Sequence, residues 1–370
     1  MAEWNLITDE AAKEVWNENL IRFDDCSPFQ TYEWGQYHKA LGWQPYYFAA
    51  TDARGEIVAM LLGLLRRYPL GIGLMWCTGG PVGDIETWGE SLHKAVLSQT
   101  KLKRLYLRFR CDRERNLNDV LFLNSQNWSR SLFAMTSCVS MELDLSKGED
   151  KLLSKLSRNW RRNLKTANSG NLTVKLCPNP DIKELCAVYE EMEQRKNLPP
   201  QFSFEKLEKL FSSSKPNLIF YRCEDAEGNL VSFRGCLITG NRACDYLAAT
   251  TERGRELRAS YAVFWKLLEH CQKQGLHSYD LGGIDFWQNP GVYKFKKDTG
   301  AREIEYLGEW DWASQPWLRL FGNWAIWQKQ RIRKVESFSV SNYLPHKWFS
   351  NKLSPSIQSD IKSAQLSEVK

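Results

Sequence analysis

Asp280-Leu281-Gly282-Gly283-Ile284-Asp285 stands near the end of this chain and is followed by Asn289-Pro290-Gly291-Val292-Tyr293-Lys294-Phe295-Lys296-Lys297-Asp298-Thr299-Gly300. A strand predicted over 276–281 runs into the glycine pair, where the backbone can turn sharply or approach a ligand closely. Three lysines then surround an aromatic ring, a combination that can hold an anionic group or stack on a nucleobase. A surface loop followed by an edge strand could have a similar composition. The glycine pair and Gly291 favour a binding site.

Length and composition indicate a globular protein with a large core. The 370 residues are 43% hydrophobic and 13% aromatic, which predicts about two domains. The mean hydropathy of −0.49 predicts solubility, and no apolar run approaches the ~18–20 residues of a membrane span. The first residues lack the features of a signal peptide. The formal net charge of +6, from 50 Lys and Arg against 44 Asp and Glu, permits a polyanionic partner without requiring one.

Cysteine and histidine usage predicts a reduced compartment and no metal. None of the ten cysteines forms a Cys-x-x-Cys pair, and several fall in apolar segments, where free cysteine behaves as a small hydrophobe. The five histidines are scattered, so we expect neither structural zinc nor a Ser/His/Asp or Cys/His nucleophile set. No Walker loop or dinucleotide fingerprint is present, and we expect no cofactor.

Alternating apolar patterns predict a similar order of strands and helices in two halves of the chain. Within them, Asp52-Ala53-Arg54-Gly55-Glu56-Ile57-Val58 matches Asp225-Ala226-Glu227-Gly228-Asn229-Leu230-Val231, and both predict a hairpin turn that enters a long strand. We therefore predict an α/β (α+β) fold with two tandem domains of mixed sheets flanked by helices, over residues 1–148 and 149–311. Residues 312–370 form a tail with an amphipathic helix.

A cationic stripe marks a predicted helix over 150–168. Its basic residues fall within an arc of about 80° at ~100° per residue, with Arg161 widening that side and Leu and Trp residues opposite. Such a stripe is often only a solvated helix face. Here no acidic residue interrupts it, and a polyanion would balance it, so phosphate contacts to RNA are an equal alternative. The candidate RNA-binding residues are Lys155, Arg158, Arg161, Arg162 and Lys165, with Lys151 on the same side.

The tail contains a predicted helix, 315–336, with tryptophans on one broad face and basic residues mostly on the other. Such a helix can lie in a membrane interface. The other interpretation, which we favour on general grounds of amphipathicity, is that the aromatic face packs on a domain. The aromatic-face residues are Trp317, Leu320, Phe321, Trp324, Trp327, Ile332 and Val335.

The segment 252–262 lies where acetyltransferases bind the pyrophosphate of coenzyme A. They use a glycine-rich turn whose backbone amides surround the phosphates at a helix N-terminus. This chain reads Arg255-Glu256-Leu257-Arg258-Ala259-Ser260, with Arg258 in place of the first glycine. The turn is therefore poorly suited to coenzyme A.

Several motifs together resemble the Fem family, the tRNA-dependent aminoacyltransferases that build peptidoglycan interpeptide bridges. The resemblance runs from about Phe29 to Trp310 and is most specific over Tyr279–Ile284 and Gly291–Lys296 with Gly300. It implies two GNAT-like acyltransferase domains. Supporting motifs are Gln30-Thr31-Tyr32-Glu33-Trp34, Gly79-Gly80-Pro81-Val82, the basic helix and Glu305-Tyr306-Leu307-Gly308-Glu309-Trp310.

The resemblance also implies the donor chemistry. In relatives, a Phe-Lys pair in the strand after the glycine-rich turn serves the aminoacyl-tRNA end and the transition state, and it falls here on Phe295 and Lys296. A fixed ammonium stabilises the oxyanion formed when an amine attacks an ester, and an aromatic ring can stack on the terminal adenine. Asp280 either organises this site or caps the glycine turn.

On the acceptor side the family pattern is incomplete. Some relatives hold a sugar-nucleotide pyrophosphate with a lysine and an arginine. This chain has Gln36 in place of the lysine, although Lys39 lies one helical turn further, and Gln201 in place of the arginine. Tyr246 and Tyr293 complete the candidate substrate-binding residues. The implied partners are aminoacyl-tRNA and a UDP-linked or lipid-linked muropeptide precursor, in the cytoplasm or peripherally at the membrane. Two alternatives remain: a tRNA-independent acyltransferase acting on an envelope polysaccharide or a small amine, and a binding protein that has lost its activity.

Overall fold

Two hairpins with the same turn begin the main strands of the two halves. Gly55 and Gly228 take left-handed φ values of 81° and 85°, which glycine adopts at little cost. The side chains of Asp52 and Asp225 each accept a hydrogen bond from the backbone four residues later, at 3.0 and 2.8 Å. The structure, a computed structural model, describes residues 2–286 and 289–335. It confirms the repeated hairpin predicted from the sequence.

The same order of elements surrounds each hairpin turn. The first half consists of β2 (Gln44–Thr51), β3 (Ile57–Tyr68), β4 (Ile72–Thr78), the crossover helix α3 (Glu90–Thr100) and β6 (Arg104–Glu114). The second half consists of β10 (Leu218–Glu224), β11 (Leu230–Thr239), β12 (Arg242–Thr250), the crossover helix α10 (Ala259–Lys273) and β13 (Ser278–Gly283). In each half, only the pair joined by the crossover helix is parallel. The predicted α/β fold with two similar halves is therefore confirmed.

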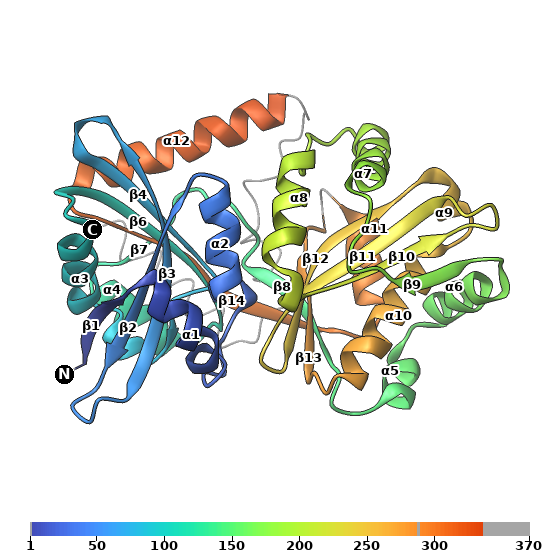
Figure 1. Cartoon of the computed structure of the whole chain (residues 1–370), viewed down its shortest axis with the longest axis horizontal. Helices are drawn as coiled ribbons and strands as arrows, with labels where there is room; N and C mark the ends of the chain where they lie inside the picture. Colours follow the sequence, from blue (N-terminus) through green and yellow to red (C-terminus); the bar gives the residue numbers. More distant parts are fainter. Residues whose placement is uncertain (1, 287–288, 336–370) are drawn as a thin grey trace.

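The two halves exchange a strand. β8 (Val139–Asp144) follows β6 in the chain but pairs antiparallel with β13 of the second half. β14 (Arg302–Ala313) follows β13 but pairs with β6 of the first half, while residues 302–305 also pair with β8. One continuous path of strands results, β1-β2-β3-β4-β6-β14-β8-β13-β12-β11-β10-β9. Figure 1 shows β14 crossing between the halves. The predicted division at residues 148/149 into domains stays a prediction.

Helices cover both faces of this sheet. On one face, α1 (Asp9–Leu20) and α2 (Tyr32–Ala40) of the first half share a single hydrophobic cluster with α7 (Ile182–Lys196) and α8 (Phe204–Ser213) of the second half. On the other face each half has a cluster of its own, under α3 and under α10. The remaining elements are β1 (Glu3–Ile7), β5 (Val82–Gly83), β7 (Ser129–Arg130), β9 (Thr173–Leu176), α4 (Leu117–Ser125), α5 (Glu149–Lys155), α6 (Arg158–Ser169), α9 (Glu252–Glu256), α11 (Pro290–Lys297), α12 (Pro316–Val335) and short 3-10 turns at 28–30, 69–71, 85–87 and 215–217.

Two local predictions are wrong. The basic helix is interrupted: α5 ends at Lys155, Leu156 is extended, and Ser157 caps α6 by accepting the backbone N–H of Trp160. The segment around Phe295 and Lys296 is the helix α11 and not a strand. Pro290 at its first turn has the fixed φ that a helix start favours, and the buried Tyr293 and Lys296 lie three residues apart on one face.

The tail helix α12 lies across the first half, where it contacts β6 and β14 (Figure 1). It docks through Leu318 and Asn323, whereas Trp317, Leu320, Phe321 and Trp324 of the predicted docking face are exposed. The favoured interpretation, that the aromatic face packs on a domain, is therefore wrong for these four residues. Ile332 and Val335, and the part of the tail after residue 335, lie outside the described side chains. Within the described part of the chain, every helix is too short or too polar to cross a membrane.

Candidate active site

The parallel strands of the second half separate early. β12 and β13 pair only over 242–244 and 278–280, whereas β4 and β6 pair continuously over 72–78 and 104–110. Asp245 of β12 and Gly282 of β13 lie just beyond the point where the strands part. Ligands of α/β sheets commonly bind beyond the carboxyl ends of parallel strands. This separation therefore marks the candidate active site, and it coincides with the glycine pair.

Lys296 projects from α11 to this point. Its Nζ donates hydrogen bonds to the carbonyl oxygens of Gly282 at 3.0 Å and Gly283 at 2.8 Å, and the residue is buried. Burial lowers the pKa of the ammonium, although Asp245 and Asp280 act in the opposite direction. An ammonium has three N–H donors, so this contact set leaves one for a ligand. The arrangement can present a single fixed positive donor to a developing oxyanion.

Asp280 is held by three donors. Its carboxylate accepts the backbone N–H of Gly282 at 2.7 Å, the hydroxyl of Tyr306 at 2.8 Å and a short hydrogen bond from Ser140. The first contact is the cap of the glycine turn that the sequence offered as an alternative role. Ser140 and Tyr306 come from the exchanged strands β8 and β14, so Asp280 joins the glycine turn to both of them. Its catalytic role stays a prediction.

Phe295 belongs to an aromatic cluster. Its ring centroid lies 5.6 Å from that of Trp160 on α6 and 5.1 Å from that of Tyr261 on α10. The guanidinium of Arg234 lies 5.4 Å from the Phe295 centroid and forms two 2.7 Å hydrogen bonds with Asp245. Phe295 is therefore half-buried and its orientation is fixed, with a cation on the ring. Stacking on adenine would use the part of the ring that remains accessible.

Tyr293 lies on the same helix but faces a different strand. It is buried, and its hydroxyl donates to Glu303 of β14 at 3.1 Å and accepts from Lys297 at 3.1 Å. Both contacts stabilise the packing of α11 against β14. Its predicted contact with substrate stays a prediction.

The basic surface lies directly outside the aromatic cluster. Lys155, Arg158, Arg161, Arg162 and Lys165 are all exposed, although the break at Leu156 divides them between α5 and α6. On the inner side of α6, Trp160 is 1% exposed and contacts Phe295. One helix therefore carries cations on its outer face and touches the candidate site with its inner face.

Two of the acceptor-side candidates point towards α1. Gln36 donates to Asp9 at 3.0 Å, and the ammonium of Lys39 pairs with the other oxygen of Asp9 at 2.6 Å. A carboxylate between these two side chains disfavours a pyrophosphate at the same place. The side of α2 that carries Trp34 faces Tyr246 instead, with ring centroids 5.6 Å apart.

Tyr246 and Gln201 share a second neighbourhood. The Tyr246 ring lies 5.9 Å from that of Phe202 and 6.0 Å from that of Phe29, so it joins the two halves of the protein. Burial raises the pKa of its hydroxyl well above the ordinary value. Gln201 is next to Phe202, and its backbone N–H is held by Glu193 at 2.7 Å. Phe202, the neighbour of the exposed Gln201, thus contacts Tyr246 on one side of α2, whereas Gln36 and Lys39 lie on another.

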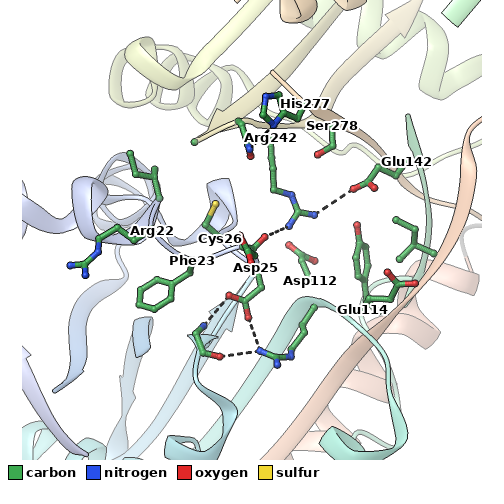
Figure 2. A pocket seen from close by; sticks show the side chains of 18 of the residues that line it. Arg22, Phe23, Asp25, Cys26, Asp112, Glu114, Glu142, Arg242, His277 and Ser278 are labelled. Carbon is green, nitrogen blue, oxygen red and sulfur yellow. Dashed lines mark hydrogen bonds and ion pairs between the residues drawn. The ribbon is translucent and has the colours of Figure 1, made fainter. Parts of the chain in front are cut away.

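An open cleft of about 940 Å³ lies between the halves. Asp25 pairs with Arg113 and accepts the backbone N–H of Gly83. Figure 2 shows Arg242 directed towards Glu142. Burial raises the pKa values of Asp25 and Glu142 despite these arginines. Tyr306, which donates to Asp280, lines the cleft. The cleft therefore reaches the hydrogen-bond network of the candidate site. Its ionisable lining consists of Asp24, Asp25, Asp84, Asp112, Glu114, Glu142, Arg22, Arg113, Arg242, Arg302 and His277.

Sequence reasoning missed the residues that support the candidate site from within the sheet. Arg234 and Asp245 occupy β11 and β12, and both are mostly buried. A charged residue inside an otherwise apolar strand is unusual unless it is paired, and that signal was available at Arg234. No such signal marked Tyr306 and Ser140, because their hydrogen bonds to Asp280 depend on the strand exchange.

Comparisons with known proteins place these features in a class. An acetyltransferase (GNAT) domain model matches residues 154–297, which include the separated strands, α10 and all of α11. A solved structure described as FemX has a TM-score of 0.73 at 16% identity and covers 86% of this chain and 99% of its own. A tandem GNAT protein of clavulanic acid biosynthesis has a TM-score of 0.53 at 10% identity, covering 85% and 99%. The domain match and the fold together show a GNAT domain over residues 154–297 within a fold of two similar halves.

Within this class, the chain is similar to the aminoacyltransferase FemA of Staphylococcus epidermidis. The two are 39% identical over 69 residues, which span 17% of this chain and 16% of that relative. The resemblance to the Fem family that the sequence predicted is thereby confirmed.

Proposed function

We propose that this protein transfers an aminoacyl group from aminoacyl-tRNA to an amine of a peptidoglycan precursor stem peptide, as in interpeptide bridge formation. The main support is that the candidate tRNA-binding and catalytic residues form a continuous series. Exposed cations on α6, Trp160 beneath them, Phe295 and the buried Lys296 follow one another from the surface to the separated strands. The similarity to aminoacyltransferase FemA supports the choice of an aminoacyl donor.

In this proposal the tRNA phosphates lie on the basic surface and the 3′ end enters beside Phe295. The acceptor amine attacks the ester carbonyl, which forms the C–N bond, and the ester C–O bond then breaks. The amine loses its proton and the released ribose oxygen gains one. Lys296 stabilises the intermediate oxyanion with its remaining N–H. Transfer of the proton within the substrates would satisfy this balance without a protein base.

The acceptor can reach this point from two sides. The neighbourhood of Tyr246 and Gln201 is one, as the family pattern implies. The cleft is the other, because its acidic groups suit an ammonium and Tyr306 connects it to Asp280. Glu142→Gln should raise the KM for the acceptor if the amine enters by the cleft, whereas Tyr246→Phe should do so if it enters by the other side. The precursor would be UDP-linked or lipid-linked, and the reaction would take place in the cytoplasm.

A tRNA-independent acyltransferase is the second candidate, and the GNAT domain match is its support. In this chain Arg258 stands immediately before α10 with φ 61°, and its guanidinium donates to the carbonyl of Arg255 at 3.0 Å. A side chain at this turn obstructs the close approach of a pyrophosphate to the backbone amides. Coenzyme A is therefore the less suitable donor.

The decisive experiment supplies both kinds of donor. Full-length protein is incubated with labelled aminoacyl-tRNAs or with acyl-CoAs, together with UDP-linked and lipid-linked muropeptides, and the products are identified by mass spectrometry. We expect transfer from aminoacyl-tRNA that is lost after ribonuclease treatment. Transfer from acyl-CoA alone would establish the second candidate instead.

A further inference from the structure

The tail helix α12 is fixed to the body of the protein by its polar side. The amide of Asn323 donates to Asp311 at 2.7 Å, and its oxygen accepts the backbone N–H of Leu132 at 3.1 Å. Two turns further, Gln330 donates to the carbonyl of Ala134 at 2.6 Å. Gly322 allows close contact, since a Cβ there would lie 2.9 Å from the Tyr106 ring. These contacts set the rotation of the helix about its own axis.

That rotation exposes a continuous apolar surface. Trp317, Leu320, Phe321 and Trp324 are 47%, 62%, 55% and 51% exposed. Their spacing of three, four and seven residues places them on one side of the helix, opposite the side that docks. We call these four residues the aromatic face. Large apolar side chains gathered in one exposed patch mark an interaction surface more often than scattered ones do.

The charged residues in the sequence of α12 are all of one sign. Pro316–Val335 contains no Asp or Glu and five basic residues, which are Arg319, Lys329, Arg331, Arg333 and Lys334. The β3–β4 hairpin lies at the same end of the sheet, because Ile72 pairs with Arg104 and Tyr106 pairs with Ala313, shortly before α12 begins. Figure 1 shows this hairpin beside one end of α12.

The tip of that hairpin extends the same kind of surface. Leu70 is 81% exposed and Tyr68 is half-exposed, and the carbonyl of Leu70 accepts a hydrogen bond from Arg104 at 2.8 Å. Lys101 and Lys103, on the loop that precedes β6, are exposed as well. Exposed apolar side chains therefore occur with cations on two separate elements.

We propose that the aromatic face and the tip of the β3–β4 hairpin dock onto a bilayer that contains anionic phospholipid. Tryptophan, phenylalanine and leucine on a helix that also carries lysine and arginine form the pattern of an interfacial helix, in which apolar side chains enter the headgroup region and cations meet lipid phosphates. Charge complementarity selects this occupant. Two copies of a face without acidic residues would repel each other, whereas an anionic bilayer neutralises both. The proposal concerns a surface distinct from the candidate active site and does not depend on the transfer reaction.

The test uses the full-length protein and vesicles that contain no muropeptide and no tRNA. Flotation is measured with phosphatidylcholine vesicles, with and without phosphatidylglycerol. The test variant combines Trp317→Ala, Phe321→Ala and Trp324→Ala. The matched control removes three exposed apolar side chains elsewhere, with Leu121→Ala, Leu176→Ala and Phe204→Ala. Circular dichroism confirms that both variants are folded, and light scattering gives their oligomeric state.

We expect wild type and control to float with the anionic vesicles, less so at high salt, and the test variant to lose at least about tenfold in partitioning. Equal flotation of the test variant and wild type would overturn the proposal. So would a wild-type protein that ignores anionic vesicles, or a dimer that disappears in the test variant only, since the occupant would then be a second copy. Because no substrate is present, each of these outcomes leaves the transfer reaction untouched.

Discussion

Replacement of Lys296 by methionine allows the contribution of this residue to stability to be measured separately from its contribution to the transfer reaction. Methionine has a similar length but neither charge nor donor, so packing on α11 changes little. In the native protein, two of the three N–H groups of Lys296 bind Gly282 and Gly283, and the third is the one available to the transition state. The variant removes all three.

The structure predicts unequal effects on the two properties. The carbonyls of the half-buried Gly282 and the exposed Gly283 lose a donor, which costs at most about 1–3 kcal/mol each, and removal of the desolvated ammonium offsets part of this loss. We expect the free energy of unfolding to change by no more than about 2 kcal/mol. Loss of an oxyanion donor should lower kcat by about 10²–10³, which corresponds to roughly 2.7–4 kcal/mol in the transition state.

The assay measures kcat and KM for aminoacyl transfer, with unfolding in urea on the same samples. Lys294→Ala is the matched control, because Lys294 lies on the same helix and is exposed. The pH profile adds a second criterion. Burial lowers the pKa of Lys296, so the wild-type rate should fall on the alkaline side below the pH expected of an ordinary lysine, and that limb should be missing in Lys296→Met. A variant as fast as wild type, with the same pH profile, would refute the assignment.

Three further predictions concern separate parts of the molecule. Tyr306→Phe removes the 2.8 Å hydrogen bond from the buried Tyr306 to the half-buried Asp280 and should cost about 1–3 kcal/mol in urea unfolding, more than the removal of an exposed tyrosine hydroxyl. The double variant Arg161→Glu, Arg162→Glu should weaken aminoacyl-tRNA binding and reduce the slope of its salt dependence by about 2. The free energy of unfolding should change by no more than about 0.5 kcal/mol. An unchanged salt slope would contradict the hypothesis that the basic surface binds tRNA. Burial lowers the pKa of His93 from 6.5 to about 3, so the unfolded chain takes up a proton first as the pH falls, and the stabilisation present above pH 6.5 is lost progressively below it. From pH 7.5 to 5 we expect the free energy of unfolding of the wild type to fall by about 2 kcal/mol, and we expect no such fall in His93→Phe. If the variant showed the same pH dependence as wild type, His93 would be excluded as the cause.

Local chemistry explains which features of the fold the sequence predicts. The two hairpins were predictable because Asp and Gly at fixed positions specify the turn. The helix α11 was not, since eight residues with a single aromatic-lysine run fit a short strand or a short helix equally well. The strand exchange between β8 and β14 was not predictable either, because an alternating apolar pattern fixes which side of a strand is buried but not which strand it pairs with.

The candidate site divides in the same manner. Phe295 and Lys296 were predictable from the family resemblance, because they occur within a contiguous motif. The paired Arg234 and Asp245 come together only through the register of β11 and β12, in which residues 234 and 248 are partners and a bulge follows Gly235. Contacts of this kind depend on the register in which two strands pair, and that register cannot be derived from a single sequence.

The two halves share one plan, but the first half closes the place where the second half is open. In the second half, β12 and β13 part after three residue pairs, and Lys296 fills part of the gap. In the first half, the parallel strands stay paired over 72–78 and 104–110. The fully buried Gln30 lies beside them, beyond the last residue pair of β3 and β4, where its amide oxygen accepts the Leu62 N–H at 2.7 Å and its amide nitrogen donates to the Thr78 carbonyl at 2.8 Å. Because backbone groups that are already satisfied inside the protein are not available to a substrate, the first half is built as a scaffold at this position. The strand exchange gives that scaffold a direct part in the candidate site: β8 and β14 place Ser140 and Tyr306 on Asp280, so the candidate site in the second half is completed by strands that also hold the first half in place.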